Sequence, residues 1–504
     1  MPYRGPRMQN ENALPPEFRS AATLLSLLRE RKLGALELLD LQLARIGRIN
    51  PKLNAVVAMD VERARADARA ADNVPAGTRG PLHGLPITIK DAYEVVGMPA
   101  TCGFPHLANH RPERDADAVA RLRAAGAIPF GKTNVPVAAA DHQSYNPVYG
   151  TSNNPWDVSR TPGGSSGGAA AAVAAGFTPL ELGSDIGGSI RCPSHFCGVY
   201  GHKSSFGAVS MRGHIPPPPG SLAMPPMGIG GPIARSAADL ELALDILAAP
   251  PESERVAWSV KFPKSRHERL SDFRVALWAD QKSFSVDRRC LDAMHAYAQD
   301  LRRLGVSVDE HARPDIDPFT SDDLYVAMLF STVSAGMPEE VLALTERVAI
   351  EMKAGPRSYA ARIARAVRLK HHEFLDLVEQ QQQLCVAWRN FFQRYDVILC
   401  PIMPTVAFPH DHSGSGPGHI EQYTRTTMVD GQPVPYLNGL QWPGLVTVAN
   451  LPATAIPTGR LIDGMPMGLQ AVGPYLEDRT PLRFAQLAEQ ALGGYVPPPT
   501  MVAG

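Results

Sequence analysis

The sequence predicts an α/β protein in which helices cover a layered sheet. Short apolar runs of strand length alternate with helical patterns along most of the 504 residues. The clearest unit lies at 270–309, where the strand pattern FRVALWA, the helix pattern CLDAMHAYAQDLRRLG and the strand pattern VSVDE follow one another. Length alone suggests about two or three domains, but large α/β enzymes often form one continuous core.

The other elements follow in chain order. Leucines at helical spacing predict helices over 20–50, which end at Asn50-Pro51, and an Ala/Arg-rich helix follows at 60–72. The alternation of apolar residues at 85–89 predicts a short strand that ends in a lysine. The remaining predictions are helices at 115–126, 169–175 and 480–491, strands at 127–130, 179–182, 397–400, 453–456 and 468–472, a turn at 131–134, glycine loops at 161–168 and 183–189, and a mostly helical stretch at 320–395.

The bulk composition excludes several classes of function. The chain carries 49 basic and 50 acidic side chains, so it lacks the basic excess that phosphate binding needs, and we expect no nucleic-acid partner. Its six cysteines form neither a disulfide framework nor a metal-ligand spacing. No signal-peptide pattern and no run of about 18 apolar residues is present, so we expect a cytoplasmic protein without a membrane span.

Three features of the sequence carry residues that could take part in catalysis or ligand binding. They are Lys90 at the end of its apolar strand, the loop GGSSGG at 163–168 and the block GSDIGGSIR at 183–191. Each is ambiguous alone. A lysine at a strand end is usually solvated, a Gly/Ser loop before a helix can be a plain turn or an anion cradle, and Ser189 can be an ordinary turn residue. The loop lacks the patterns of a Walker motif and of a dinucleotide-binding motif.

At this spacing the three blocks resemble the signature of the amidase family, which uses a Ser-Ser-Lys triad. The family's first serine lies in GGSSGG, and its nucleophile follows 24 residues later in DIGGSIR, which assigns these roles to Ser165 and Ser189. Its lysine lies in GxPxxxKD, matched by Gly84–Asp91, so the third catalytic residue is Lys90. The resemblance extends from about residue 20 to about residue 490, through 131–134, 149–151, 154–156, 230–232 and 465–470.

The resemblance implies an α/β/α sandwich with a large twisted mixed β-sheet covered by helices. It implies a single domain at 20–495, with an extension at 1–19 and a tail at 496–504, and it assigns 320–395 to the substrate entrance. It further implies that the first serine follows a cis peptide bond, that no cofactor or metal is needed, and that the protein is a monomer or a homodimer.

Amide hydrolysis explains why these residue types are needed. An amide is a poor electrophile with a poor leaving group, so the enzyme must supply an activated nucleophile, an oxyanion site and a proton for the amine. Ser189 would attack, and Ser165 would relay its proton to Lys90, whose burial among apolar residues would keep it neutral. The predicted oxyanion donors are the backbone N–H groups of Ile186, Gly187, Gly188 and Ser189.

Other polar residues near these blocks receive structural interpretations. We interpret Asp185 and Arg191 as an ion pair that anchors the nucleophile loop, and Ser166 as a supporting hydrogen-bonding residue. A serine hydrolase invites a catalytic histidine, but a lysine base leaves no role for one. We therefore assign no catalytic role to the nearby histidines, which are His195, His202 and His214.

The sequence says less about the substrate. The small residues at 138–140 leave room for a bulky acyl or aryl group, so we expect a relatively apolar amide: an aryl acylamide, a fatty amide, a carbamate (urethane) or an oligoamide. The methionines and the tryptophan below are adaptable apolar candidates, but each can equally be a core residue. The predicted substrate-binding residues are Ala138, Ala139, Ala140, Gly163, Gly164, Met224 and Trp442, with Met227 and Met328 as further candidates.

Several alternatives remain open. The same triad can serve an esterase or an acyl transferase. The amidotransferase subunits of the family that act on misacylated tRNA carry an SSLDQ-like segment, and 221–227 departs from it. An inactive scaffold would not need the three catalytic residues, and nucleotide binding would have to use the loop at 163–168. The polar segment at 409–418 is interpreted as a surface loop or lid, whose two histidines lack a third metal ligand.

Overall fold

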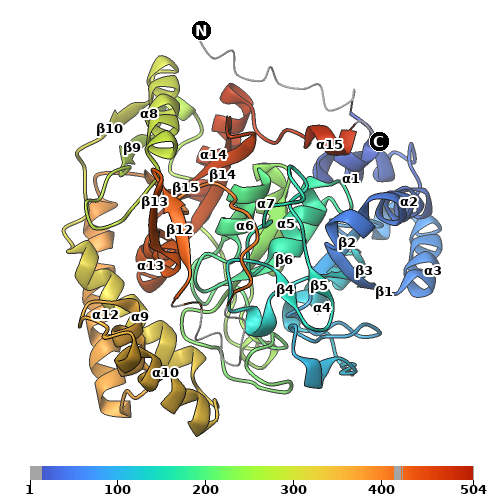
Figure 1. Ribbon diagram of the computed structural model, residues 1–504. Helices are drawn as coiled ribbons and strands as arrows, with labels where there is room; N and C mark the ends of the chain where they lie inside the picture. The colour runs from blue at the N-terminus through green and yellow to red at the C-terminus, as the bar shows by residue number, and fades with distance from the viewer. Residues whose placement is uncertain (1–13, 414–421, 423, 503–504) are drawn as a thin grey trace.

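The computed structural model describes residues 14–413, 422 and 424–502, and its central feature is an 11-stranded sheet (Figure 1). The strand order is β1-β3-β2-β6-β8-β7-β14-β15-β11-β9-β10. The strands are β1 (Val56–Met59), β2 (Pro86–Lys90), β3 (Ile128–Thr133), β6 (Leu180–Asp185), β7 (Tyr200–Lys203), β8 (Ile229–Ala234), β9 (Arg274–Leu277), β10 (Ser307–Asp309), β11 (Val397–Cys400), β14 (Ala453–Ile462) and β15 (Met465–Val472).

The sheet is mixed, as predicted. β3, β2 and β6 run parallel at one side, and β11, β9 and β10 run parallel at the other. The strands between them pair antiparallel, from β6 through β8, β7, β14 and β15 to β11. Two hairpins lie apart from this sheet: β4 (Tyr145–Asn146) with β5 (Gly150–Thr151), and β12 (Thr426–Val429) with β13 (Gln432–Pro435).

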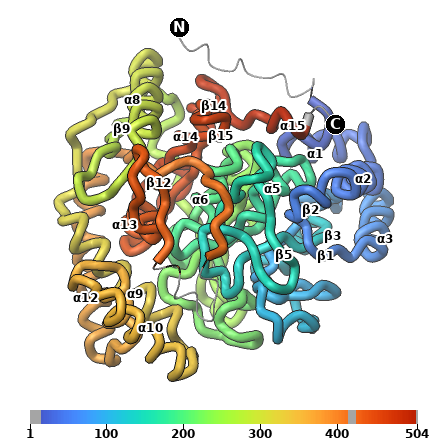
Figure 2. The backbone as a smooth tube through the Cα atoms, in the orientation of Figure 1, coloured from blue at the N-terminus to red at the C-terminus, as the bar shows by residue number. Residues whose placement is uncertain are grey.

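Helices cover the sheet and form a separate group at one end. Figure 2 follows the chain through this group, α9 to α12, in yellow and orange, opposite the blue helices α1 to α3. No helix among the described residues is both long and apolar enough to cross a bilayer. The helices are α1 (Ala21–Arg29), α2 (Ala35–Leu53), α3 (Val61–Asp72), α4 (Asp117–Ala124), α5 (Gly167–Ala174), α6 (Arg191–Cys197), α7 (Ala237–Leu247), α8 (Arg288–Arg303), α9 (Pro318–Val333), α10 (Glu339–Glu351), α11 (Tyr359–Ala366), α12 (His371–Phe391), α13 (Gln441–Val448), α14 (Arg479–Leu492) and α15 (Pro499–Val502).

One core cluster reaches almost from end to end of the described chain. It contains Phe18 near the start and Met501 near the end. Arg45 on α2 links these parts, because its guanidinium donates to the carbonyls of Ala175 and Met501 and lies over the Phe18 ring. Residues that were predicted as an extension and a tail therefore pack in part against the core, while 1–13 and 503–504 lie outside the described residues.

Two predicted loops are wrong at their edges because strands continue into them. The turn predicted at 131–134 is strand as far as Thr133, since Lys132 and Thr133 pair in register with Ile89 and Lys90 of β2. The glycine loop predicted at 183–189 begins later, because 183–185 pair with β8. The helical prediction for 320–395 is confirmed by α9 to α12.

Candidate active site

The sheet brings the three predicted catalytic residues to one edge. β2 lies between β3 and β6 and runs parallel to both, so Lys90 at its end faces the loops that follow β6 and precede α5. Ser165 lies in the loop before α5, and Ser189 follows β6. Lys90, Ser165 and Ser189 are 0%, 1% and 6% exposed. The carboxyl ends of adjacent parallel strands commonly hold ligand sites, and this edge has that geometry.

Lys90 has the environment of a base. Its Nζ lies 2.7 Å from Ser165 Oγ, 2.9 Å from Ser184 Oγ and 3.4 Å from the Ser184 carbonyl oxygen. Burial lowers the pKa of Lys90 from 10.5 to about 7, against smaller opposing effects of Cys102, Asp185 and Glu181. A substantial fraction of the amine is therefore neutral near neutral pH and has a lone pair available for a proton.

The loop before α5 accepts only glycine at Gly164. A Cβ there would lie 2.3 Å from the Asp141 carbonyl oxygen, too close for any side chain. The Gly164–Ser165 peptide bond is cis, as the family resemblance implies. Ser144 holds the loop, because its hydroxyl donates to the Gly163 carbonyl and accepts from the loop's backbone. The predicted substrate-binding residues Gly163 and Gly164 therefore lie in the tightly packed part of the loop.

The two serine loops meet through the backbone. Ser166 N–H donates to the Ser189 carbonyl at 3.1 Å, and Ser166 Oγ donates to the Ser184 carbonyl at 3.3 Å, which confirms Ser166 as a supporting residue. Among the described residues, Ser189 Oγ has no hydrogen-bond partner. The predicted hydrogen bond between Ser189 and Ser165 is therefore absent, and the Ser189 hydroxyl has no partner among the described residues.

Asp185 organises the nucleophile loop. Its carboxylate accepts from the N–H groups of Gly188 and Ile190 and pairs with Arg191 at 2.8 Å. Burial would raise the pKa of Asp185, but the Arg191 guanidinium holds it below its usual range. The interpretation of this ion pair as a structural anchor is confirmed, since both side chains are fully buried and bonded within the fold.

The four predicted oxyanion donors differ in whether their N–H groups are free. The prediction for Gly188 is wrong, because its N–H already donates to Asp185 at 2.8 Å. The N–H groups of Ile186, Gly187 and Ser189 have no partner among the described residues, so these three remain available. Their loop is held from outside, because Tyr325 on α9 donates its hydroxyl proton to the Ile186 carbonyl at 3.0 Å. His142 Nε2 lies 2.9 Å from the Gly187 carbonyl.

The structure adds two residues that the sequence did not identify. Ser184 Oγ lies 2.9 Å from Lys90 Nζ and 2.8 Å from His214 Nε2. Of the three nearby histidines, His214 is thus one hydroxyl away from the lysine. His195 instead contacts the backbone of β15, and His202 lies between Thr454 and Asp478. Ser184 lies within the sequence block at 183–191, but the parallel pairing of β2 with β6 in the structure is what places it beside Lys90.

The predicted substrate-binding side chains lie in different environments. Ala138 and Ala139 are half-buried in left-handed conformations, and Ala140 is exposed. Met224 is half-buried and accepts a hydrogen bond from Met211 N–H at 3.1 Å. Trp442 packs edge-on against Trp278 and Phe284 and is 1% exposed, so it occupies the core position that the sequence left open as its alternative.

Met227 and Met328 belong to a second core cluster beside the nucleophile loop. The cluster includes Tyr325 and Leu440, and Ile186 packs against it. A Cβ on Gly187 would lie 3.0 Å from both Leu440 and Tyr325. Apolar side chains therefore line one side of the loop that carries Ser189. The predicted lid at 409–418 is described only to residue 413, and 414–418 lie outside the described residues.

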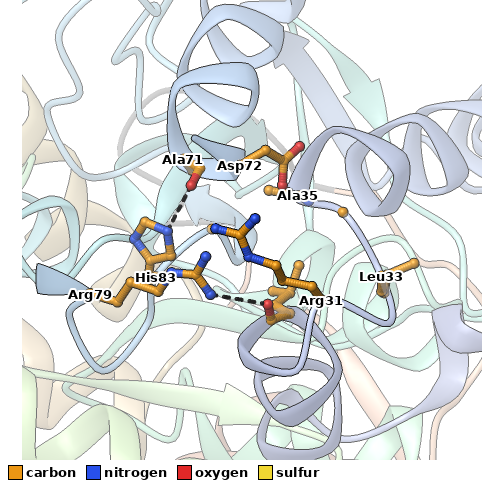
Figure 3. A pocket seen from close by; sticks show the side chains of 10 residues that line it. Arg31, Leu33, Ala35, Ala71, Asp72, Arg79 and His83 are labelled. Atoms are coloured by element: carbon orange, nitrogen blue, oxygen red, sulfur yellow. Dashed lines mark hydrogen bonds between the residues drawn. The ribbon is translucent and has the colours of Figure 1, made fainter. Parts of the chain in front are cut away.

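Two cavities lie among helices. The first, of about 150 Å³, is lined by residues of the N-terminal helices and of the segments that connect them to β2, among them Arg31, Arg79 and His83, and includes none of the predicted site residues (Figure 3). The second, of about 850 Å³, lies among α9 to α12, and Arg362 and Lys370 are among its lining residues. It lies within the region that was predicted to shape the substrate entrance.

Comparison with known proteins identifies the family. A model of the amidase family matches residues 37–482. The chain belongs to the amidase family. The family supports an enzyme that hydrolyses carbon–nitrogen bonds of amides, as the sequence predicts, and a small-molecule substrate.

Individual relatives cover nearly the whole of this amidase. A glutamyl-tRNA(Gln) amidotransferase subunit from Geobacillus stearothermophilus is 32% identical, with 94% of this chain and 97% of that protein covered. A Mycobacterium bovis chain named as an amidase, AmiB2, is 34% identical, with 94% and 96% covered. A crystal structure of an amidase superposes with a TM-score of 0.73 at 28% identity, with 93% and 99% covered. A bacterial aryl acylamidase shares the fold at 22% identity, with a TM-score of 0.76 and 94% and 96% covered.

Proposed function

We propose that this amidase cleaves a carboxylic amide through a Ser-Ser-Lys triad of Ser189, Ser165 and Lys90 and an acyl-enzyme intermediate. The observation that carries the proposal is the 2.7 Å contact between Lys90 Nζ and Ser165 Oγ in a fully buried site. Burial supports the role of Lys90 as a base, because it lowers the pKa of the amine to about 7. A general base is most effective when its pKa lies near the working pH.

The proton would move through the two serines in both directions. As Ser189 Oγ bonds to the amide carbon, its proton passes to Ser165 Oγ, and the proton of Ser165 passes to Lys90 Nζ. The C–N bond then breaks, and the proton returns from Lys90 through Ser165 to the departing nitrogen. Water then attacks the acyl carbon and gives a proton to Lys90 through Ser165. The bond between Ser189 Oγ and the acyl carbon breaks, the proton returns to Ser189, and the carboxylic acid leaves. The hydrogen bond between Ser189 and Ser165 would form as substrate binds, since such contacts often tighten only in the complex.

The negative charge on the carbonyl oxygen would be held by backbone donors. Ile186, Gly187 and Ser189 supply the three N–H groups that no described residue occupies. One correctly placed donor contributes about 3 kcal/mol to the barrier reduction in enzymes of this kind. Asp185 would contribute indirectly, because its bonds to the loop backbone fix where these donors lie.

The substrate class that we propose is a relatively apolar amide, such as an aryl acylamide, a fatty amide, a carbamate or an oligoamide. It is supported by the apolar cluster beside Ile186, which includes Met227 and Met328. Apolar walls with few polar groups favour such ligands. The small side chains at 138–140 would leave space for a bulky group. An esterase activity through the same acyl-enzyme is the expected side reaction.

A second candidate is a role in tRNA-dependent amidotransfer, which the relatives' names suggest. Its support is the 32% identity to the amidotransferase subunit from Geobacillus stearothermophilus. Against it stand the divergent segment at 221–227 and the formal charge of −1, which offers no basic excess for tRNA. Release of ammonia from glutamine would favour this candidate, while hydrolysis of an anilide without activity on glutamine would favour the first.

The decisive experiment compares purified protein with Ser189→Ala and Lys90→Ala on p-nitroacetanilide and on a longer-chain p-nitroanilide. We expect the wild type to release nitroaniline and both folded variants to lose the activity by orders of magnitude. A preference for the longer chain would support the apolar substrate. If either variant kept its activity, the proposed mechanism would be wrong. Activity only on glutamine would replace the proposed substrate class.

A further inference from the structure

A chain of hydrogen bonds ends at the proposed base. His214 Nδ1 lies 3.0 Å from the Pro216 carbonyl oxygen, and His214 Nε2 lies 2.8 Å from Ser184 Oγ. Ser184 Oγ in turn lies 2.9 Å from Lys90 Nζ, which contacts Ser165 Oγ. All four side chains are buried or nearly so. The mechanism proposed above gives no role to Ser184 or His214.

The chemistry of the partners sets the direction of each proton. The Pro216 carbonyl can only accept, so His214 Nδ1 must carry a proton. Burial, and then the charge of Lys90, lower the pKa of His214 to about 3, so the ring is neutral and Nε2 has no proton. Nε2 is then an acceptor, and the hydroxyl of Ser184 must donate to it.

The direction of the hydrogen bond from Ser184 to His214 determines how the contacts of Lys90 are arranged. With its proton committed to His214, Ser184 Oγ can only accept from Lys90, and the Ser184 carbonyl can only accept as well. A neutral amine has two N–H bonds and one lone pair. The two N–H bonds are directed at these two acceptors, so the lone pair remains for the third contact, Ser165 Oγ.

We propose that His214 is a positioning residue for the base: by accepting the Ser184 hydroxyl proton, it keeps Ser184 as an acceptor and so aims the lone pair of Lys90 at Ser165. This inference rests on the proposed function, because it assigns a role within that triad. The arrangement also suits the protonated lysine. Its three N–H bonds then meet three acceptors, so a proton can leave and return while Ser184 stays fixed.

The imidazole is held rigidly enough for this role. Its ring packs edge-on against Tyr93, with ring centroids 4.8 Å apart, and the backbones of Tyr93 and His214 form a bridge. Tyr93 lies three residues beyond the end of β2 and donates a hydrogen bond from its hydroxyl to the carbonyl of Gly183, beside Ser184. The same residue thus joins the strand of Lys90 to the histidine.

Other ionisable groups near Lys90 have partners of their own. Asp185 pairs with Arg191, and Glu181 accepts from the hydroxyls of two threonines. Burial raises the pKa of the Cys102 thiol, so this group is uncharged near neutral pH, and the hydrogen bonds of the Lys90 amine go to hydroxyls and a carbonyl. Among the described residues, His214 is therefore the ionisable group that reaches Lys90 through Ser184.

The test compares His214→Phe, which removes the acceptor, with His214→Gln, whose amide oxygen can accept from Ser184. The substrate-independent readout is the rate at which a fluorophosphonate modifies Ser189, followed by intact mass from about pH 5 to pH 10 beside anilide turnover. We expect His214→Phe to lower the plateau rate at high pH by about tenfold or more, because the lone pair is no longer aimed. His214→Gln should recover most of the rate.

Combination with Ser184→Ala separates positioning from general damage to the fold. Without the Ser184 hydroxyl, His214 has nothing to orient, so His214→Phe should add little to the loss in Ser184→Ala. An undiminished further loss in the double variant, or a folded His214→Phe with the wild-type plateau, would overturn the proposal. If His214→Phe does not fold, the comparison of Ser184→Ala with Ser184→Thr tests the proposal. Ser184→Thr should keep the rate of Ser189 modification, because its hydroxyl can still donate to His214. Equal losses of rate in the two variants would refute the role of His214. Modification that persists in Ser189→Ala would instead refute the triad.

Discussion

Two lysines on neighbouring strands, Lys90 at the end of β2 and Lys132 on β3, are equally buried but have different partners. Lys132 Nζ lies 3.4 Å from an Asp91 carboxylate oxygen and donates to the carbonyls of Tyr93 and Pro99. All of these are acceptors, so a lone pair on Lys132 would have no donor to meet. Lys90 instead contacts two hydroxyls and one carbonyl.

The comparison shows that burial alone does not make a base. Burial lowers the pKa of both amines, but at Lys132 the charge of Asp91 opposes this, whereas Lys90 has no carboxylate in an ion pair among the described residues. A hydroxyl can either accept from an ammonium or donate to an amine, and a carboxylate can only accept. Hydroxyl partners therefore allow Lys90 to exchange a proton, while Lys132 serves as a structural cation.

Replacing each lysine by methionine should separate these roles, with the largest effects of all. Lys90→Met should abolish amide hydrolysis and change stability little, because it breaks no ion pair. Lys132→Met should leave Asp91 buried without its cation and lower the free energy of unfolding by about 3–5 kcal/mol. Urea unfolding and anilide turnover measure the two effects. A Lys132 variant that is as stable as the wild type would break the distinction.

The pH profile follows from the same environment. The base must be neutral to accept a proton, and an amine is protonated below its pKa. With the pKa of Lys90 lowered to about 7, kcat/KM should rise with pH through about 7 and level off above it. The measurement is kcat/KM for an anilide across this range, since it reports ionisation of the free enzyme. A rise centred near the ordinary lysine pKa would show that burial does not tune Lys90.

The sequence predicted the residues that lie within contiguous motifs. Lys90 and Ser165 were identified from spacing, and their side chains meet in the structure. The availability of Gly188 N–H was mispredicted, because a motif does not reveal that Asp185, three residues earlier, accepts a hydrogen bond from that N–H. Ser184 lies within the block at 183–191 but was not predicted as a site residue, because its position beside Lys90 follows from the parallel pairing of β2 with β6.

Contacts between distant segments were beyond sequence reasoning. His214 reaches Ser184 across 30 positions, on a loop whose path depends on the bridge to Tyr93. Tyr325 reaches Ile186 across 139 positions, from a helix that shows no motif. Periodicity predicts that such a helix exists, but it does not predict how the helix packs against a loop.

The hydrogen bond from Tyr325 to the Ile186 carbonyl predicts an effect of intermediate size on the activity. A peptide plane directs its C=O and N–H in opposite directions, so the bond from Tyr325 to the Ile186 carbonyl also fixes where the Gly187 N–H points. Tyr325→Phe should lower kcat by about tenfold with a smaller change in KM, because oxyanion stabilisation acts in the transition state.

A matched control for this variant is Tyr495→Phe, which removes the same kind of bond, at 2.8 Å, from the Ala174 carbonyl. It should lose comparable stability and keep kcat. If both variants lowered kcat equally, the effect of Tyr325 would come from general loosening of the fold rather than from the oxyanion loop. Steady-state kinetics and thermal unfolding of both proteins decide between these explanations.

The smallest effect concerns substrate choice at Ala139. Its side chain is half-buried, and its φ of 54° is left-handed, a strain that Phe and Ala share. Ala139→Phe should therefore lower kcat/KM for a long-chain anilide several-fold relative to the acetyl anilide, because the added ring occupies space for the acyl group. Ala139→Gly relieves the strain and adds no bulk, so it should leave that ratio unchanged. Equal losses on both anilides in Ala139→Phe would place Ala139 outside the acyl site and leave the apolar cluster beside Ile186 as the remaining support for an apolar substrate.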